Sequence, residues 1–302
     1  MTAGNAPVRK GILLAGGRGT RLYPLTRTVN KHLLPVFDKP LIYYPLTTLM
    51  LAGIREIFVL SDPRDLGAMR EALGDGRQWG LEIQYGAQAR PGGIAEGLLV
   101  AADFIGNDPF CLILGDNIFY GREFISTLLQ AAELAHDKAV IFTQPVAEPQ
   151  RYGVVKLDAA GKPLMIVEKP VDPPSNEAVT GLYFYDRRAV SFARKLAPSK
   201  RGELEITDLN RVYLEAGDLV AKRLGRGLVW FDAGSPHNLL LAAELVQVIQ
   251  ARQRTGIAFP EEVAYRLGYI DLRAFYALVD AMPEGEYRQY LHSLREEFGP
   301  AA

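Results

Sequence analysis

Residues 11–27 join an apolar run to a turn rich in glycine and arginine: Gly11-Ile-Leu-Leu-Ala-Gly-Gly-Arg-Gly-Thr-Arg-Leu-Tyr-Pro-Leu-Thr-Arg27. The apolar run predicts a buried strand over residues 8–15. Gly16, Gly17 and Gly19 let the backbone of the turn approach a ligand closely and present N–H groups to an anion. Because two arginines in the same turn add positive charge, the stretch predicts a phosphate-binding loop. A glycine-rich turn with solvated arginines is the alternative.

Neither of the two common phosphate-binding motifs fits this loop. A GxGxxG motif that starts at Gly17 would need a glycine where Leu22 stands, and the Gly-Lys-Ser/Thr of a P-loop is absent from the loop. The sequence therefore disfavours a dinucleotide-binding dehydrogenase and a P-loop NTPase.

Strand-like and helical segments alternate along the first half of the chain. Strands are expected over residues 8–15, 54–60, 81–85, 109–114 and 139–143, with helices over 41–52, 63–73, 94–104 and 123–135. This alternation predicts an α/β fold with a doubly wound, mostly parallel, Rossmann-like sheet. Ligands of such sheets bind beyond the carboxyl ends of the strands, which makes the loops after Ala15, Tyr85 and Leu114 candidate sites.

The pattern changes after residue 145. Extended segments are expected over residues 152–157, 164–168, 179–186, 220–224 and 228–231, with helices over 187–196 and 205–215. Helical segments then follow over residues 236–254, 260–267, 271–280 and 284–298. We therefore expect a β insertion after the first sheet and a helical tail at the C-terminal side.

Composition limits the classes of partner. The chain has 302 residues, with 34 basic and 35 acidic side chains and a formal net charge of −1. Because binders of nucleic acid or of membrane surfaces normally have a basic excess, we expect neither partner. Cys111, the only cysteine, cannot form an internal disulfide, which fits a reducing cytoplasm. No signal-peptide core and no membrane span are expected, so the prediction is a cytoplasmic protein.

The string GGxGTRLxPxTxxxxK, from Gly16 to Lys31, resembles the signature of sugar-1-phosphate nucleotidylyltransferases. Further strings, over roughly residues 8–290, resemble the short glucose-1-phosphate thymidylyltransferases. They are Lys39-Pro-Leu-Ile-Tyr-Tyr-Pro-Leu, Gly115-Asp-Asn-Ile-Phe-Tyr-Gly, Arg151-Tyr-Gly-Val-Val, Glu168-Lys-Pro, Val179-Thr-Gly-Leu-Tyr-Phe-Tyr-Asp and Arg201-Gly-Glu-Leu-Glu-Ile-Thr-Asp.

The resemblance implies transfer of a nucleotidyl group from dTTP to α-D-glucose 1-phosphate, giving dTDP-glucose and pyrophosphate, as the first step of dTDP-rhamnose and deoxysugar biosynthesis. This chemistry needs fixed cations around the phosphates rather than a protein nucleophile. The resemblance implies that Arg21 holds the leaving pyrophosphate, that Lys31 holds the α-phosphate, and that Asp116 and Asp232 bind Mg²⁺. Use of UTP, use of another hexose phosphate, and a catalytically silent nucleotide-sugar sensor are the alternatives.

The resemblance also assigns the binding residues. Thymine would lie on Gln88 and the Gly93 backbone, because an amide offers both a donor and an acceptor. The full nucleotide-binding set is Leu14, Gly16, Gly17, Gly19, Thr20, Gln88, Gly93 and Asp116. The sugar-phosphate set is Gly153, Glu168, Lys169, Val179, Tyr183 and Arg201.

Two departures from the family pattern stand near these positions. Glu96-Gly97 replaces the more common Gln-Ala, which we interpret as a change on a helix surface. Asp232-Ala-Gly-Ser replaces Asp-Thr-Gly-Thr, which we expect to loosen that loop while keeping the carboxylate.

The resemblance also implies a division of the chain. We expect a catalytic domain over residues 1–240, in which about 8–145 bind the nucleotide and about 146–240 bind the sugar phosphate. The helical tail, residues 241–302, is then either a subunit interface of a homotetramer or a layer packed on its own domain.

Overall fold

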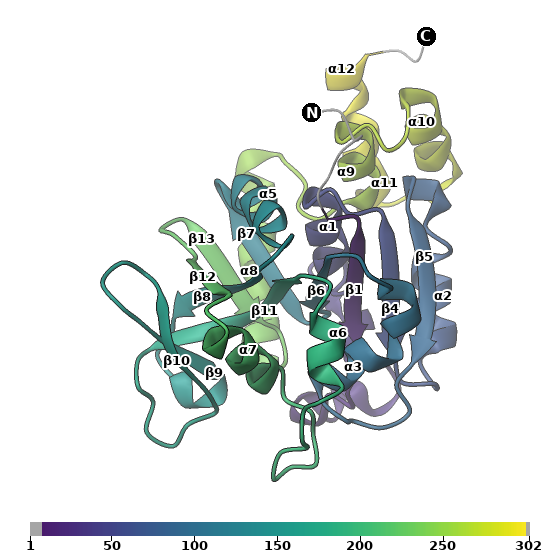
Figure 1. The fold of residues 1–302 in the computed structure, drawn as a ribbon. Helices are drawn as coiled ribbons and strands as arrows, with labels where there is room; N and C mark the ends of the chain where they lie inside the picture. Colours follow the sequence, from purple (N-terminus) through teal and green to yellow (C-terminus); the bar gives the residue numbers. More distant parts are fainter. Residues whose placement is uncertain (1–7, 300–302) are drawn as a thin grey trace.

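The computed structural model describes residues 8–299 and contains one large mixed sheet (Figure 1). Its strands are β1 (Lys10–Ala15), β4 (Glu56–Ser61), β5 (Glu82–Ala87), β6 (Phe110–Leu114), β8 (Ala139–Pro145), β9 (Gly153–Leu157), β10 (Pro163–Glu168), β11 (Glu177–Tyr185) and β12 (Leu219–Arg223). The order is β10-β9-β11-β6-β1-β4-β5, while β8 pairs with both β11 and β12. Only β10 and β11 run against the other strands, so the predicted mostly parallel α/β sheet is confirmed.

Helices cover both faces of the sheet, as a doubly wound fold requires. Leu13 of β1 lies in one core and the adjacent Ile12 lies in the other, because successive side chains of a strand point to opposite faces. The Leu13 core includes α1 (Tyr43–Leu51), α2 (Leu66–Leu73) and α5 (Phe124–Leu134), and the Ile12 core includes α3 (Ile94–Val100), α4 (Ala102–Ile105), α6 (Ala189–Ala193) and α7 (Ile206–Glu215). Burial on both faces explains why the central strands are apolar runs rather than alternating ones.

Two small sheets were not expected from the sequence. The first pairs β7 (Asn117–Gly121) with β13 (Leu228–Asp232), antiparallel, and brings Asn117 opposite Asp232. The second pairs β2 (Pro35–Val36) with β3 (Lys39–Pro40). The β7–β13 pair is important for the site because it joins residues more than a hundred positions apart at the end of β6.

The C-terminal helices pack on the end of the sheet near α1 (Figure 1). After α8 (Pro236–Gln253) they are α9 (Pro260–Arg266), α10 (Leu272–Ala281), α11 (Glu286–Ser293) and α12 (Arg295–Phe298). Trp79 donates to the buried Glu261 carboxylate at 3.1 Å, and Tyr269 donates to the Met50 carbonyl at 3.1 Å. The tail therefore packs on its own domain. The predicted boundary between the catalytic domain and the tail, after residue 240, falls inside helix α8, which continues without a break through that position. The boundary therefore stays a prediction.

None of the helices within residues 8–299 combines the length and the apolar character needed to cross a membrane.

Candidate active site

A cavity of about 640 Å³ opens at the carboxyl ends of β1, β5 and β6, where a doubly wound sheet is expected to bind its ligand. Residues from both halves of the chain line it. Of the predicted site residues, the cavity gathers Leu14, Gly16, Gly17, Arg21, Gln88, Gly93, Asp116, Gly153, Glu168, Lys169, Val179, Tyr183, Arg201 and Asp232. Gly19, Thr20 and Lys31 do not line it; Thr20 faces an adjoining hollow, and Lys31 reaches the site through Asp116.

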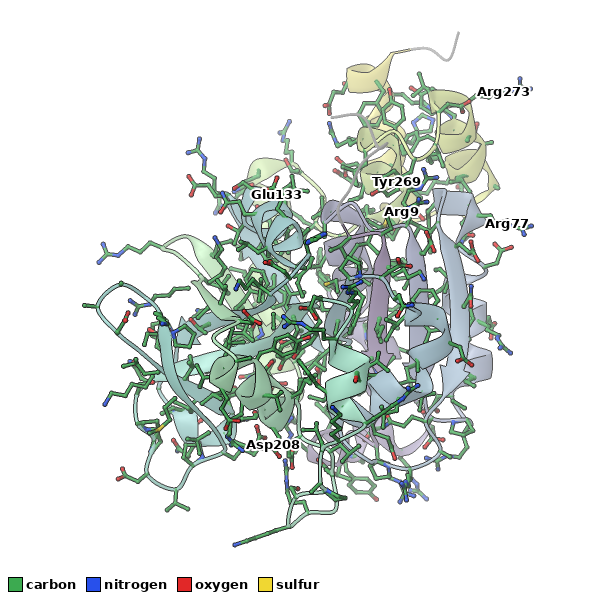
Figure 2. The ribbon with its side chains drawn as sticks, in the orientation of Figure 1. Arg9, Arg77, Glu133, Asp208, Tyr269 and Arg273 are labelled. Carbon is green, nitrogen blue, oxygen red and sulfur yellow. The ribbon has the colours of Figure 1, made fainter. Side chains whose placement is uncertain are left out.

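A larger hollow, of about 790 Å³, lies at the opposite end of the sheet and includes Arg9, Arg55 and Arg77. It contains none of the predicted site residues. Figure 2 shows Arg9 and Arg77 near the helical tail, whereas Asp208, which follows the cavity residue Thr207, lies at the far end of the molecule. The predicted site residues therefore lie toward one end of the molecule.

The glycine loop after β1 depends on backbone conformations that favour glycine. Gly17 has φ +93° and Gly19 has φ +57°. A Cβ at Gly19 would lie 2.9 Å from Thr26 Cγ2 and 3.2 Å from Lys31 Cβ, so the loop could not fold against Lys31 with a larger residue. The hydroxyl of Thr26 donates to the Gly19 carbonyl at 2.9 Å and fixes the turn.

Lys31 and Asp116 form an ion pair behind the cavity wall. Lys31 Nζ lies 2.5 Å from Asp116 Oδ2, and the two side chains are only 14% and 9% exposed. Burial by itself would raise the pKa of Asp116, but the Lys31 charge and hydrogen bonds from Lys31 and Asn117 outweigh it and hold that pKa well below the usual range. Asp116 is therefore ionised at neutral pH despite its burial.

Asp232 lies beside Asp116, at the end of β13. Burial and the negative charge of Asp116 raise the pKa of Asp232, as expected when two carboxylates share one site. Arg21 Nη1 lies 3.7 Å from Asp232 Oδ2. A Cβ at Gly234 would lie 2.5 Å from Arg21 Nη2 and 2.7 Å from Asp232 Oδ1, so a side chain there would displace the arginine or the carboxylate. Among residues 8–299 no cluster of three or more metal-ligating side chains forms, so a metal here would rely on these two carboxylates.

The loop after Asp232 is well held, although the sequence predicts loosening. The Ala233 N–H donates to the Asp116 carbonyl at 2.8 Å, and Asn238 Nδ2 donates to the Asp232 carbonyl at 2.8 Å. Ser235 caps α8 by accepting from the Asn238 N–H. These hydrogen bonds hold the loop in place, and the effect of the two threonine replacements on its mobility stays a prediction.

Asn117 is a site residue that the sequence reasoning missed. Its Nδ2 donates to Asp116 Oδ1 at 3.1 Å, while its Oδ1 accepts from the Gly181 N–H at 2.9 Å and from Trp230 Nε1. Asn117 therefore connects the carboxylate to β11 and β13. Its place next to Asp116 was the only sequence signal, because its partners lie 64 and 113 residues away.

Gln88 and Gly93 lie together in the loop between β5 and α3. Gln88 Nε2 donates to the Gly93 carbonyl at 3.1 Å and to Glu96 Oε2 at 2.9 Å. The second half of the chain closes over this loop, since the Leu204 N–H donates to the Gly92 carbonyl at 2.8 Å and the Leu204 carbonyl accepts from Ala95 at 3.1 Å.

The interpretation of Glu96-Gly97 as a helix-surface change was wrong. The Glu96 side chain is only 16% exposed because it contacts Gln88 and Arg90. Gly97 is buried, and a Cβ there would lie 2.9 Å from Leu14 Cδ1 and 3.0 Å from Leu60 Cδ2. Both positions therefore form part of the wall behind the loop of residues 88–93, which we call the base loop.

The sugar-side residues converge on Glu168, at the end of β10. Thr207 donates to Glu168 Oε2 at 2.6 Å, and Lys169 Nζ lies 3.5 Å from Glu168 Oε1. A Cβ at Gly153 would lie 2.9 Å from Thr207 Oγ1, so glycine keeps this network open to the cavity. Lys169 has φ +40°, a conformation uncommon for residues with a side chain, and its N–H is held by the Tyr152 carbonyl.

Arg201 is held in place by acidic neighbours. Its Nη2 donates to both carboxylate oxygens of Glu205, at 2.8 and 2.9 Å, and lies 3.4 Å from Glu168 Oε1. Glu205 and Thr207 are thus further site residues, absent from the predicted set, that fix the charged groups of this wall.

His32 is a structural residue. A Cβ at Gly115 would lie 2.6 Å from His32 Cδ2, and His32 Nδ1 lies 2.7 Å from Asn30 Oδ1. Burial, together with the charge of Lys31, lowers the pKa of His32 to about 3. The imidazole is therefore neutral at physiological pH and supports the turn that carries Lys31.

We expect the free energy of unfolding to depend on pH through His32. Its pKa is 6.5 as a free side chain and about 3 in the fold, so between these values the unfolded chain binds one more proton. Stability therefore falls as the pH drops below 6.5, with His32 contributing up to about 1.4 kcal/mol per pH unit. Urea unfolding at several pH values should show a shallower dependence for His32→Gln. The exposed His136 provides the control, since His136→Gln should keep the wild-type slope; equal slopes for His32→Gln and wild type would contradict the expectation.

The fold and this site agree with known proteins. Residues 10–248 match the family model described as nucleotidyl transferase. The chain therefore belongs to the nucleotidyl transferase family, which confirms the predicted enzyme class.

Relatives within the family are more specific. The chain is 50% identical, over 286 residues, to the glucose-1-phosphate thymidylyltransferase of Xanthomonas campestris pv. campestris (strain B100), with 95% of this chain and 97% of the relative covered. A crystal structure of a protein from Bacillus anthracis, described as a glucose-1-phosphate thymidylyltransferase in complex with sucrose, superposes with a TM-score of 0.73 at 40% identity, covering 79% of this chain and 95% of that one. UDP-glucose pyrophosphorylase in complex with UDP-glucose gives a TM-score of 0.71 at 28% identity, covering 80% and 99%.

Proposed function

We propose that the protein transfers a thymidylyl group from dTTP to α-D-glucose 1-phosphate with Mg²⁺, giving dTDP-glucose and pyrophosphate. One observation carries the proposal: a single cavity joins the glycine loop and base loop of residues 8–145 to the Glu168, Lys169 and Arg201 cluster of residues 146–240. The relatives named glucose-1-phosphate thymidylyltransferase support the choice of substrates. The product would supply dTDP-rhamnose and other deoxysugars in the cytoplasm.

In this reaction a phosphate oxygen of glucose 1-phosphate forms a bond to the α-phosphorus of dTTP. The bond from that phosphorus to the bridging oxygen breaks, and pyrophosphate leaves with the electron pair. Arg21 is 56% exposed at the cavity mouth, which suits a group that holds the departing pyrophosphate. Lys31, nearly buried beside Asp116, suits the α-phosphate. Fixed cations at both places stabilise the charge that develops on the phosphate oxygens.

Asp116 and Asp232 fit a divalent cation such as Mg²⁺, which binds to one or two protein carboxylates and to phosphate oxygens. The ionised state of Asp116 at neutral pH supports this assignment. Bound Mg²⁺ would neutralise negative charge on the triphosphate. Asn117 and Gly234 orient the two carboxylates by hydrogen bonds.

The remaining residues divide between a nucleotide side and a sugar-phosphate side of the cavity. Backbone N–H groups at Gly16, Gly17, Gly19 and Thr20 would hold the triphosphate beside Leu14, and Gln88 and Gly93 would bind thymine. Glu168 and the backbone at Gly153 and Val179 would bind the sugar hydroxyls, with Tyr183 forming the floor. Lys169 and Arg201 would bind the phosphate of glucose 1-phosphate, because both offer cationic donors at that wall.

A homotetramer is the proposed assembly. Helix α8 leaves Leu240, Leu241 and Val248 exposed by 57%, 38% and 56%, so its apolar surface is a candidate for contact with a second subunit. The proposed division of the chain is a catalytic domain of residues 1–240 and a helical tail of residues 241–302. The tail would contribute to the contact with a second subunit.

Measurement of pyrophosphate release with a panel of nucleoside triphosphates and sugar phosphates tests the proposal. The expected result is the highest kcat/KM for dTTP with glucose 1-phosphate. Faster turnover with UTP would overturn the base assignment alone, and a better hexose phosphate would overturn the sugar assignment alone. If no pair releases pyrophosphate, the proposed reaction is wrong.

A further inference from the structure

We propose that Glu96 is a positioning residue that sets nucleotide selectivity, because its carboxylate fixes the Gln88 amide so that only the amide oxygen faces the base. The proposal deepens the proposed function and rests on it. It concerns discrimination between pyrimidine bases, and it assigns a role to a position at which the sequence departs from the family pattern.

The orientation of the Gln88 amide follows from its neighbours. One side of the amide meets two acceptors, the Gly93 carbonyl at 3.1 Å and Glu96 Oε2 at 2.9 Å. A carbonyl oxygen and a carboxylate can only accept, so the NH₂ group must face them. The reversed amide would place Oε1 against both oxygens and would lose both hydrogen bonds.

The Gln88 oxygen therefore points the other way, toward the glycine loop. A Cβ built at Gly16 would lie 3.5 Å from Gln88 Oε1, and both residues line the cavity. Both N–H groups of the Gln88 amide are used by Gly93 and Glu96, so the group that Gln88 offers to a base is an acceptor alone, and not the donor and acceptor that the sequence predicts. An acceptor that stands opposite N3 of the base receives the N3–H of thymine or uracil, whereas it meets the N3 lone pair of cytosine, which an oxygen repels.

A carboxylate at position 96 enforces this orientation more strictly than an amide would. A glutamine there could turn its own NH₂ toward Gln88 and stabilise the reversed amide. Glu96 cannot do so, and its other oxygen accepts from Arg90 Nε at 3.0 Å, which holds the carboxylate in place. A charged acceptor also gives a stronger hydrogen bond than a neutral one.

Glu96 also lies in the first turn of α3, where a negative charge stabilises a helix. If Glu96 only stabilised the helix, its substitution would change the stability of the protein and would leave the choice of base unchanged. The selectivity ratio, defined as kcat/KM for dTTP divided by kcat/KM for dCTP, therefore separates the two roles.

The test compares wild type with Glu96→Gln, a substitution of equal size. We expect the selectivity ratio to fall by about fivefold, through a higher KM for dTTP and a lower KM for dCTP, with kcat nearly unchanged. Asp103→Asn, an equal charge change at an exposed position of α4, should leave the ratio at the wild-type value. An unchanged ratio in Glu96→Gln, or an equal fall in Asp103→Asn, would overturn the proposal.

A double-mutant cycle tests whether Glu96 acts through Gln88. In Gln88→Ala, no amide remains to be oriented, so the further change Glu96→Gln should leave the ratio where Gln88→Ala put it. An additional fall of the same size would show that Glu96 acts by another route. The wild-type assay separates this proposal from the proposed function: if wild type uses dTTP and the ratio does not respond to Glu96, only the positioning role fails.

Discussion

Asp116→Asn is expected to reduce metal-dependent release of pyrophosphate by about a thousandfold or more. The substitution keeps the shape of the side chain but removes the charge that Lys31 stabilises at 2.5 Å. An amide binds a divalent cation less strongly than a carboxylate does, and Asp232, whose pKa is raised by burial, would be the one carboxylate left of the proposed pair. Titration with Mn²⁺, followed by its paramagnetic signal, should show weaker binding in parallel with the loss of kcat.

Two further measurements make this result specific. Glu133→Gln removes a carboxylate from the exposed surface of α5 (labelled in Figure 2), which does not line the cavity, and should leave turnover and Mn²⁺ binding unchanged. Urea unfolding shows whether Asp116→Asn remains folded, since the change leaves Lys31 without its partner. Near-normal turnover by a folded Asp116→Asn protein would disprove the role of Asp116 in metal binding.

The fold could be predicted from the sequence because its determinants are local. The expected strand over residues 8–15 is observed as Lys10–Ala15, and the expected helix over 205–215 is observed as Ile206–Glu215. Apolar runs, glycines and helix caps decide such elements within a few neighbouring residues. The β7 strand was missed because it begins directly after the short Gly115-Asp116 turn, and its pairing with the distant β13 makes it a strand.

The site could be predicted only in part, for a related reason. Motif strings located the loops that meet in the cavity, but the hydrogen bonds among them connect residues far apart in the chain. Asn117 and Trp230 are 113 residues apart, and Thr207 and Glu168 are 39 apart. Glu96 shows the same limit at short range: its position on a helix suggested exposure, whereas the fold turns it toward Gln88.

Lys31→Met is expected to lower kcat by about a thousandfold and to shift the acid limb of the pH–rate profile to higher pH. The first effect follows from loss of a cation proposed to contact the α-phosphate. The second follows from Asp116: burial raises the pKa of its carboxyl, and the Lys31 charge is the largest opposing contribution. Without Lys31 the pKa of Asp116 rises, so the carboxylate is lost at a higher pH than in wild type and residual activity falls earlier as the pH decreases.

The pH profile distinguishes two roles of Lys31. If the lysine acted only on the substrate, kcat would fall while the acid limb stayed in place. Arg77→Met is the matched control, because it removes an exposed cation at the opposite end of the sheet, in the hollow that contains none of the predicted site residues. Its profile should match that of wild type. Wild-type kcat in Lys31→Met would contradict the assignment of Lys31 altogether, whereas a shifted acid limb with reduced kcat would show that one ammonium group both keeps the metal carboxylate ionised and supports the transfer.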